Sequence, residues 1–413
     1  MKKGLVLFLA VVSVFCFSQS FAAPWAVVAT NPDIDRNASS GTIHTVDLGV
    51  SPPKVYGPFL EYKLGSGGGG LFDIVMVPGQ RYALITNFGD STMYRIDLKD
   101  PTNPVWAGKV DIPFFAEDIA CTPDGKLALV TDGGFSSRIA FIDLETFKLN
   151  GTFKTGDRQA QAVAVAPNNS TVVFADYWNF KIHYGKINKK KNGLTDMGSV
   201  FLCAGTASKD PVTGNDKCDN NDLLARPVNV TISPNGKTVL AAICTAGFVA
   251  ALEINDAGQA VAGNPLFIGG FGGTWDNSSN PDPSIEVTTA LQSIAFQSDA
   301  KAYALHVPKP YPDPDNASHI IDRPMRLTPV VIEGPGKVKF GDNASTDLLV
   351  GGTSQLFGVD SVAIAGWQAV VGNPTLSGAK TGKMSYANLH TKEFTELKLN
   401  SNGIATGVAI KYY

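Results

Sequence analysis

Histidine and cysteine are scarce in this chain, which contains five of each in 413 residues. No Cys-x-x-Cys-His motif is present, so covalently attached haem is not indicated. The histidines also lack the short spacings of a zinc site. No Gly-x-Ser-x-Gly nucleophile elbow occurs either. These absences argue against a haem- or copper-bearing electron-transfer protein and against the serine hydrolases that use that elbow.

Charge is equally sparse, since charged residues make up only 17% of the chain and its net charge is −3. The one basic run, Lys189–Lys191, falls at an expected hairpin tip, where a solvated turn is the ordinary explanation. Nucleic-acid binding favours a concentrated basic face, so we expect no nucleic-acid partner. No helical domain is visible, whereas 42 glycines and 44% hydrophobic residues suit many short antiparallel strands around a large core.

The chain begins with a long apolar run typical of a transport signal. Lys2 and Lys3 precede apolar residues 4–17, and Ser20 and Ala22 are the small residues that a signal peptidase reads. We expect residues 1–22 to be a bacterial Sec signal peptide and 23–413 to be the mature protein, periplasmic or extracellular and without a membrane span. A retained membrane anchor is the alternative, although the run is short for a bilayer crossing. Cleavage makes the net charge −5, since 32 basic residues then face 37 acidic ones.

A repeated unit fills the rest of the chain. It consists of an apolar strand, a turn of the Pro-Asp-Gly type and a second apolar strand, as in EDIACTPDGKLALVTD at 117–132. Further copies start at residues 72, 162, 228, 292 and 360. A seventh copy is split, because GVAIKYY at 407–413 is a first strand without a successor and WAVVATN at 25–31 is a second strand without a predecessor.

The split copy predicts a closed ring. Such units cannot bury both faces alone, so neighbours stack, and pairing 407–413 with 25–31 removes the exposed ends of the array. Third strands such as SRIAFIDL (137–144) and weaker fourth strands complete four-stranded units. Pro78, Pro123 and Pro167 are 45 and 44 residues apart, close to the roughly 40–45 residue period of propeller blades. We therefore predict an all-β, seven-bladed β-propeller forming a single domain over 23–413.

The segments TPDGKLALVTD, with RIAFIDL after it, and RYALITNFGDSTMYRIDL resemble the YVTN type of β-propeller repeat. In that repeat a Pro-Asp-Gly-Lys turn leads into a strand ending in Thr-Asn and then into an Ile-Asp-Leu strand. Two blades match well, two match moderately and the others match only in pattern. The resemblance implies the propeller fold and indicates little about activity, since propellers host many functions.

Cys203 and Cys218 bracket a polar loop, and in an exported protein we expect them to form a disulfide. The strand plan also gives the longer loops a direction. If first strands run toward the Pro-Asp-Gly turns, loops after second and fourth strands emerge on the opposite face, here called the upper face. The excursions 206–224, 271–290 and 308–323 all lie there, on consecutive blades, and we expect them to form a wall or lid beside a binding site.

Short polar residues end the second strands near the ring axis on that face. They are Asn31, Asn87, Asp132, Asp176 and Asn373, with His306 beside them. Oxygen atoms converging from several segments suit a polar ligand or a hard cation, and Ca²⁺ held by Asp132 and Asp176 is the candidate. The competing explanation is that each residue caps its own turn, a use that a repeat protein makes in every blade.

The loops that enter the first strands bring Glu117, Arg158 and Arg226 to the same region, together with Asp73, Asp118, Gln161, Gln292 and Asp360. We predict a binding or scaffold protein that recognises a protein or surface-polymer partner through its upper face. The alternative is a metal-assisted, lactonase-like hydrolase with its site in the upper axial channel, and a non-catalytic role is favoured. The ligand and the oligomeric state do not follow from the sequence.

Overall fold

The computed structural model describes residues 24–411 apart from several segments: 32–39, 64–69, 135, 157–158, 204–206, 210–215, 219–225, 244–247, 264–265, 268–287, 309–310, 314–315, 322–324, 342–347, 351–361, 373–381 and 401–403. For some strand residues beside these segments, including Gln292 and His306, only the backbone is described. The described part of the chain contains strands and turns but no helix, and so no helix long and apolar enough to cross a membrane.

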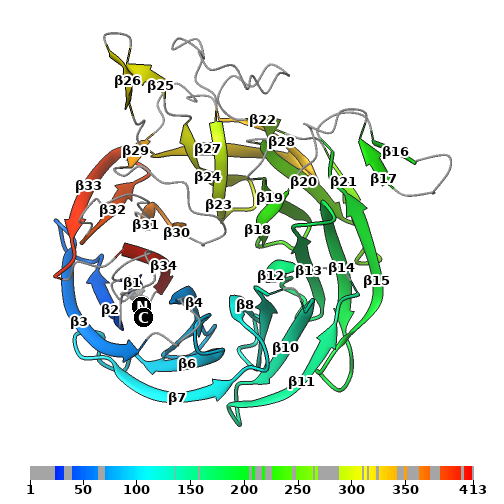
Figure 1. Ribbon diagram of the computed structural model, residues 1–413, viewed down its shortest axis with the longest axis horizontal. Helices are drawn as coiled ribbons and strands as arrows, with labels where there is room; N and C mark the ends of the chain where they lie inside the picture. The colour runs from blue at the N-terminus through cyan, green and yellow to red at the C-terminus, as the bar shows by residue number, and fades with distance from the viewer. Residues whose placement is uncertain are drawn as a thin grey trace, which may run out of the picture.

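Seven antiparallel sheets are arranged around an axis as a β-propeller (Figure 1). Blades 1 to 4, each from its inner to its outer strand, are β34 (Ile404–Lys411), β1 (Trp25–Asn31), β2 (Ser40–Asp47), β3 (Lys54–Lys63); β4 (Leu71–Met76), β5 (Tyr82–Asn87), β6 (Thr92–Asp97), β7 (Val105–Asp111); β8 (Ala116–Cys121), β9 (Leu127–Asp132), β10 (Arg138–Asp143), β11 (Lys148–Lys154); and β12 (Ala160–Val165), β13 (Thr171–Asp176), β14 (Lys181–Ile187), β15 (Leu194–Phe201).

Blades 5 to 7 are β18 (Pro227–Ile232), β19 (Thr238–Ile243), β20 (Phe248–Ile254), β21 (Ala260–Ala262); β23 (Thr288–Ser298), β24 (Lys301–Pro308), β27 (Met325–Gly334), β28 (Lys337–Phe340); and β30 (Val362–Ala365), β31 (Gln368–Gly372), β32 (Lys383–Asn388), β33 (Glu393–Lys398). Two short strands, β22 (Leu266–Phe267) and β29 (Leu348–Val350), extend the outer edges of blades 5 and 6. The predicted fold class is thus confirmed.

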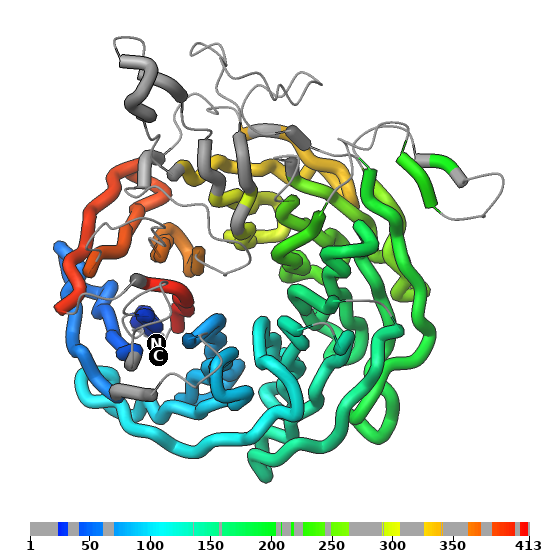
Figure 2. Tube along the Cα trace, in the orientation of Figure 1, coloured from blue at the N-terminus to red at the C-terminus, as the bar shows by residue number. Residues whose placement is uncertain are grey.

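Blade 1 closes the ring as the split repeat predicts. The strand β34 pairs antiparallel with β1, with Trp25 opposite Lys411 and Val28 opposite Val408. The C-terminal strand starts at Ile404, three residues earlier than expected, and the described part of it ends at Lys411. The inner strands then contact one another in turn around the axis, from β34 through β4, β8, β12, β18, β23 and β30 back to β34 (Figure 2).

The hydrophobic core is divided among the junctions between blades. Seven clusters of buried side chains occur in the described residues, and each joins two adjacent blades. Phe141 and Phe174, for example, are fully buried at the junction of blades 3 and 4. Second strands are packed on both faces, which explains why β9, β13 and β19 read as continuous apolar runs.

The turns after the first strands also connect the blades. The Gly125 amide donates to the Thr122 carbonyl within its own turn, and the Asp124 amide donates to Asn169 Oδ1 of the next blade at 2.7 Å. Gly125 has a φ of +67°, and a Cβ there would lie 2.4 Å from the Pro78 carbonyl oxygen of the preceding blade. This face, here called the lower face, is therefore occupied by structural contacts.

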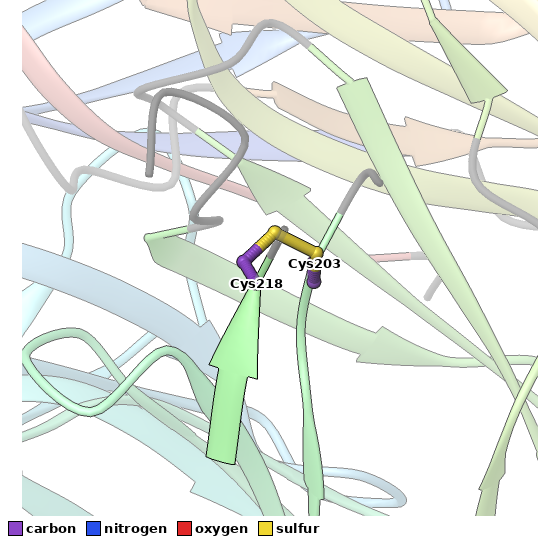
Figure 3. Close-up of a disulfide and its surroundings, with 2 residues drawn as sticks. All are labelled: Cys203 and Cys218. Atoms are coloured by element: carbon purple, nitrogen blue, oxygen red, sulfur yellow. A yellow bond between two sulfur atoms is a disulfide. The ribbon is translucent and has the colours of Figure 1, made fainter. Parts of the chain in front are cut away.

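A disulfide joins Cys203 to Cys218 with Cα atoms 5.7 Å apart, as predicted (Figure 3). It links the end of β15 to a hairpin of β16 (Ala207–Lys209) and β17 (Asp216–Cys218). Lys181 Nζ of β14 also lies 3.2 Å from Asp216 Oδ2 of that hairpin. In Figure 1 the hairpin lies outside the outer strand of blade 4, so this insertion extends away from the axis rather than over it.

The other long excursions fall only partly within the described residues. A second hairpin, β25 (Tyr311–Asp313) with β26 (Asn316–Ile321), interrupts blade 6 between β24 and β27. Most of 271–290 lies outside the described residues. Both hairpins follow a second or a fourth strand, as the sequence predicts. A wall or lid formed by the three excursions stays a prediction.

Candidate functional site on the upper face

A β-bulge recurs near the upper end of the inner strand. In blades 1 to 6 the ladder between the first and second strands shifts register by one residue at this level, at Thr406, Phe72–Asp73, Glu117–Asp118, Gln161, Val228 and Gln292. Bulges bend a strand and re-aim its side chains, and they are common beside functional sites. The equivalent residues of blade 7 lie outside the described part of the chain.

In blades 2, 3 and 5 one side chain of the bulge joins the blade to the next one. Asp73 accepts a hydrogen bond from the Ile119 amide at 3.2 Å. Asp118 accepts one from the Val163 amide at 2.5 Å. Asn229 Oδ1 accepts one from the Ile294 amide at 3.1 Å. These three residues therefore have a structural role, since each caps a backbone amide on the inner strand of the next blade.

The residues that end the second strands make local hydrogen bonds. Asn31 holds the backbone of Leu71 in blade 2 with both of its amide atoms, at 2.8 and 3.0 Å. Asn87 Oδ1 accepts from the Gly89 amide at 3.0 Å, and Asp132 Oδ1 accepts from the Gly134 amide at 2.8 Å. The capping explanation thus accounts for an oxygen of Asn87 and of Asp132, whereas Asn31 joins blade 1 to blade 2. Ligand binding by these residues stays a prediction.

Asp132 and Asp176 titrate differently although they occupy equivalent positions. Burial raises the pKa of Asp132, and the hydrogen bond from the Gly134 amide opposes that rise. Burial also acts on Asp176, but hydrogen bonds from His183 and Asn179 outweigh it, so the pKa of Asp176 lies below its ordinary value. His183 Nε2 lies 3.2 Å from Asp176 Oδ2.

The described residues contain no group of three or more His, Cys, Asp or Glu side chains placed to hold a metal ion. Both carboxylates proposed as calcium ligands already accept hydrogen bonds from their own turns. We therefore derive no chemical step through a metal, and calcium binding by Asp132 and Asp176 stays a prediction.

A chain of hydrogen-bonded side chains crosses from blade 4 to blade 3. Trp178 Nε1 donates to Gln159 Oε1 at 2.6 Å. Gln159 Nε2 donates to Gln161 Oε1 at 2.8 Å, and Gln161 Nε2 donates to Glu117 Oε1. Gln159 Nε2 also lies 3.3 Å from the Gly133 carbonyl oxygen, which accepts from it. The chain ends at a carboxyl group that is only 3% exposed.

Glu117 is the most perturbed acid of this region. Burial, followed by repulsion from Asp118, raises the pKa of Glu117 well above its usual value, so the carboxyl holds its proton at higher pH than an exposed glutamate does. Its Oε2 has no hydrogen-bond partner, and neither has the buried Nδ2 of Asn87 on the neighbouring blade. Unpaired buried polar atoms are costly and rare, which marks this junction as unusual within the fold.

An aromatic stack covers the junction of blades 2 and 3. The rings of Phe72 and Phe88 are 5.4 Å apart, and those of Phe88 and Phe115 are 4.9 Å apart, both in stacked geometry. A Cβ on Gly133 would meet Phe88 and Glu117 Oε2 at 2.6 Å, so glycine is needed there for close packing. The stack ends at Phe115, whose side chain is 43% exposed.

Arg226 lies against a second group of aromatic rings at the other end of the hydrogen-bonded chain. Its guanidinium carbon is 5.1 Å from the ring centre of Tyr177, 4.9 Å from Trp178 and 5.6 Å from Phe180. Trp178 keeps 37% of its surface exposed. Phe115, Glu117, Gln161, Gln159, Trp178 and Arg226 thus form one connected set on blades 3 to 5, here called the upper strip.

The structure brings only part of the predicted site together. Glu117 and Arg226 belong to the upper strip, whereas Asn31 joins blade 1 to blade 2. Arg158, Asn373 and Asp360 lie outside the described residues, and the side chains of Gln292 and His306 are not described. Sequence reasoning missed Phe72, Phe88, Phe115 and Gln159. For Phe72 a signal existed in the sequence: it occupies the repeat position of Glu117, and a repeat position whose chemistry changes from blade to blade can mark a site.

No protein-family profile matches the chain, and no curated protein is similar to it in sequence. Several solved structures are similar in fold. A protein of unknown function from Desulfotomaculum acetoxidans has a TM-score of 0.61 and 12% identity, over 94% of this chain and 98% of its own. A periplasmic gluconolactonase from Pseudomonas aeruginosa has a TM-score of 0.61 and 12% identity, over 95% and 99%. A 6-phosphogluconolactonase homologue from Bacteroides fragilis, described only by similarity, has a TM-score of 0.58 and 13% identity, over 96% and 99%. Identities this low show the fold alone: this chain is a seven-bladed β-propeller.

Proposed function

We propose that this protein is an exported binding protein that recognises a protein or surface-polymer partner through the upper strip. The observation that carries the proposal is the pair of exposed rings, Phe115 and Trp178, on either side of the buried Glu117 carboxyl. Trp178 is connected to that carboxyl through Gln159 and Gln161. Aromatic rings and arginine are enriched at the energetic centres of interfaces. The lower face, by contrast, uses its turns to join blades.

The chemistry of the strip favours recognition over catalysis. Its amide groups supply donors and acceptors without net charge, and the raised pKa of Glu117 keeps that carboxyl less charged than an exposed one. Exposed rings give a partner a rigid surface at small cost in side-chain entropy. A partner with planar or ring-shaped groups and neutral hydrogen-bonding atoms fits this surface best.

Export rests on two observations. Residues 1–22 carry the signal-peptide pattern, and the Cys203–Cys218 disulfide is of a kind that persists mainly in oxidising compartments. A periplasmic or extracellular location also suits a partner on the cell surface. Fusing residues 1–22 to a reporter that is active only after export tests this part of the proposal, and a reporter that stays inactive in the cytoplasm contradicts it.

The binding proposal is tested with residues 23–413 immobilised and exposed to purified bacterial peptidoglycan, exopolysaccharide and secreted protein. For the polymer that binds, Phe115→Ala and Trp178→Ala should each weaken affinity about tenfold or more, since aromatic residues at interface centres contribute about 2 kcal/mol or more. Val105→Ala and Val261→Ala remove exposed apolar side chains from outer strands and serve as matched controls. Equal losses in all four variants would contradict a site at the strip.

A hydrolase of the lactonase type is the second candidate. One observation favours it, namely that Glu117 is a buried carboxyl of raised pKa with an unpartnered oxygen, which are features of a general acid. A fold neighbour is described as a periplasmic gluconolactonase. If this candidate is right, residues 23–413 hydrolyse glucono-lactone. Glu117→Gln then abolishes turnover, and adding Gln159→Glu to that variant does not restore it. No turnover above the uncatalysed rate leaves the binding role.

A further inference from the structure

A cavity in the axial channel is separate from the upper strip. Its volume is about 390 Å³, and it runs along six consecutive residues, 229–234, of β18 and the turn after it. The facing walls come from β12, β23 and β30, through Val165, Phe296 and Val362 among others. Pro167 and Pro234, which also line it, belong to turns of the lower face, and Asn229 lies at the level of the bulges, so the cavity extends along the channel from that level to the lower face.

The wall formed by β18 is the free edge of a sheet. β18 is the innermost strand of blade 5 and pairs only with β19. The Ser233 amide donates to the Thr238 carbonyl, toward β19. Because amides alternate in direction along an antiparallel strand, the backbone groups of Val230 and Ile232 point away from β19. Each of these residues therefore directs an N–H and a C=O toward the channel.

Blade 4 lacks the side chain that caps the next inner strand in blades 2, 3 and 5. Asp73, Asp118 and Asn229 each accept a hydrogen bond from the inner strand of the following blade. Ala162 occupies the same bulge position in blade 4, since Ala162 stands opposite Ala175 as Asn229 stands opposite Ala242. A methyl group cannot accept a hydrogen bond from the Val230 amide. The repeat is interrupted at the strand that lines the cavity.

The lining is neutral as well as partly polar. None of the lining residues in the described part of the chain carries a charge. Thr231 and Ser233 add hydroxyl groups, whereas Val165, Phe296 and Val362 form an apolar wall. An occupant that carries a charge would lose its hydration without a partner, which is strongly unfavourable. A neutral occupant loses much less hydration free energy on entering the cavity.

From these observations we propose that the cavity binds a short, neutral, extended peptide segment, which pairs with the free edge of β18. A sheet edge presents alternating N–H and C=O groups, and a peptide amide supplies both complements. The apolar wall takes one small aliphatic side chain. This site is independent of the partner proposed for the upper strip.

The test uses N-acetylalanine N-methylamide as the probe, with residues 23–413 as the protein. Binding is followed by saturation-transfer NMR and by the amide signals of Val230 and Ile232 in a labelled sample. Two matched compounds separate the chemistry: N-acetylalanine carries a carboxylate, and methyl 2-acetoxypropanoate replaces both N–H groups by oxygen. The proposal expects the probe to bind at least about tenfold more tightly than either compound.

Two variants locate the site. Ala162→Asn supplies the missing cap to the Val230 amide and should weaken the probe about fivefold to tenfold, the value of one hydrogen bond plus lost space. Thr231→Trp fills the cavity and should abolish binding even if Ala162→Asn fails to fold. Ala162→Val, which adds a side chain without a hydrogen-bond acceptor, is the matched control and should change affinity less than twofold.

Several results overturn the proposal. Binding that is unchanged in Ala162→Asn and in Thr231→Trp places the probe elsewhere, and absence of binding, or equal binding of N-acetylalanine, excludes a neutral peptide site. Phe115→Ala and Trp178→Ala should leave the probe unaffected. Loss of polymer binding in those two variants with intact probe binding is the result expected if both proposals hold. A wild-type protein that binds the polymer but not the probe overturns the cavity proposal alone, whereas one that binds the probe but no polymer overturns the proposed function alone.

Discussion

His44 should make the stability of this propeller vary with pH in the mildly acidic range. The side chain is 0% exposed on β2, and neither ring nitrogen has a hydrogen-bond partner. Burial lowers the pKa of His44 from 6.5 to about 4. Between these two values the unfolded chain binds a proton that the folded protein does not, so stability is complete above pH 6.5 and declines as the pH falls toward 4.

The magnitude follows from the size of the shift. A change of one unit in pKa corresponds to about 1.4 kcal/mol, so the shift of His44 removes about 3 kcal/mol of unfolding free energy between pH 7 and pH 4. His44→Leu cannot titrate and should lack this loss. The variant should also be at least as stable as the wild type at pH 7, because it removes two buried polar atoms that are unpaired.

Urea unfolding, followed by tryptophan fluorescence at pH 7, 5.5 and 4, measures both effects. The other titrating groups are common to both proteins, so the difference between wild type and variant isolates His44. The gap should widen in favour of the variant by about 3 kcal/mol from pH 7 to pH 4. A gap that stays constant over this range refutes the reasoning, since it means that His44 has the same pKa in both states.

Three further predictions concern other parts of the molecule. Replacing Cys203 and Cys218 by serine should lower the unfolding free energy by about 3 kcal/mol, the loop-entropy value for their separation of 15 residues, and equal stability with and without reductant would contradict it. Gly125→Ala should lower the melting temperature by several degrees through its positive φ and the approach to Pro78, whereas an unchanged melting curve would show that the turn relaxes freely. Because the pKa of Glu117 is higher in the folded protein than in the unfolded chain, the free energy of unfolding falls as the pH rises above the pKa of the unfolded chain. Glu117→Gln should therefore gain stability over wild type between pH 4 and pH 8, measured by denaturant unfolding. A gap between these two proteins that narrows with rising pH would be inconsistent with a buried, proton-holding carboxyl.

The candidate site was predictable only where a repeat position carried a distinctive residue. Glu117 was identifiable because it lies at the start of the first strand of a clear repeat. Arg226 was identifiable because it directly precedes the first strand of a later repeat. Phe115 and Gln159 lie in connections that follow no repeat pattern. Their importance depends on contacts with Phe88 of blade 2 and Trp178 of blade 4, and no local pattern indicates which residues meet across a blade junction.

The bulges explain why register arguments stopped short of the site. A one-residue shift moves every later side chain to the other face of a strand. The alternation of FDIVMV and EDIACT was readable. The pattern did not show, however, which of the two bulge residues, Phe72 or Asp73 and Glu117 or Asp118, would face the neighbouring blade. The structure shows that Asp73 and Asp118 cap the neighbouring blade while Glu117 faces the chain of amide groups.

The number of blades and the closure of the ring by its two ends were readable from the chain alone, because strand alternation, turn residues and spacing are local and recur in every unit. The disulfide was readable because its two cysteines bracket a single short loop. Tertiary structure decided which residues converge. Glu117 meets Gln161 across 44 residues, and β18 faces β23 and β12 around a cavity. Such contacts arise from packing one blade on the next, where each junction is filled by different side chains and no repeat dictates the outcome.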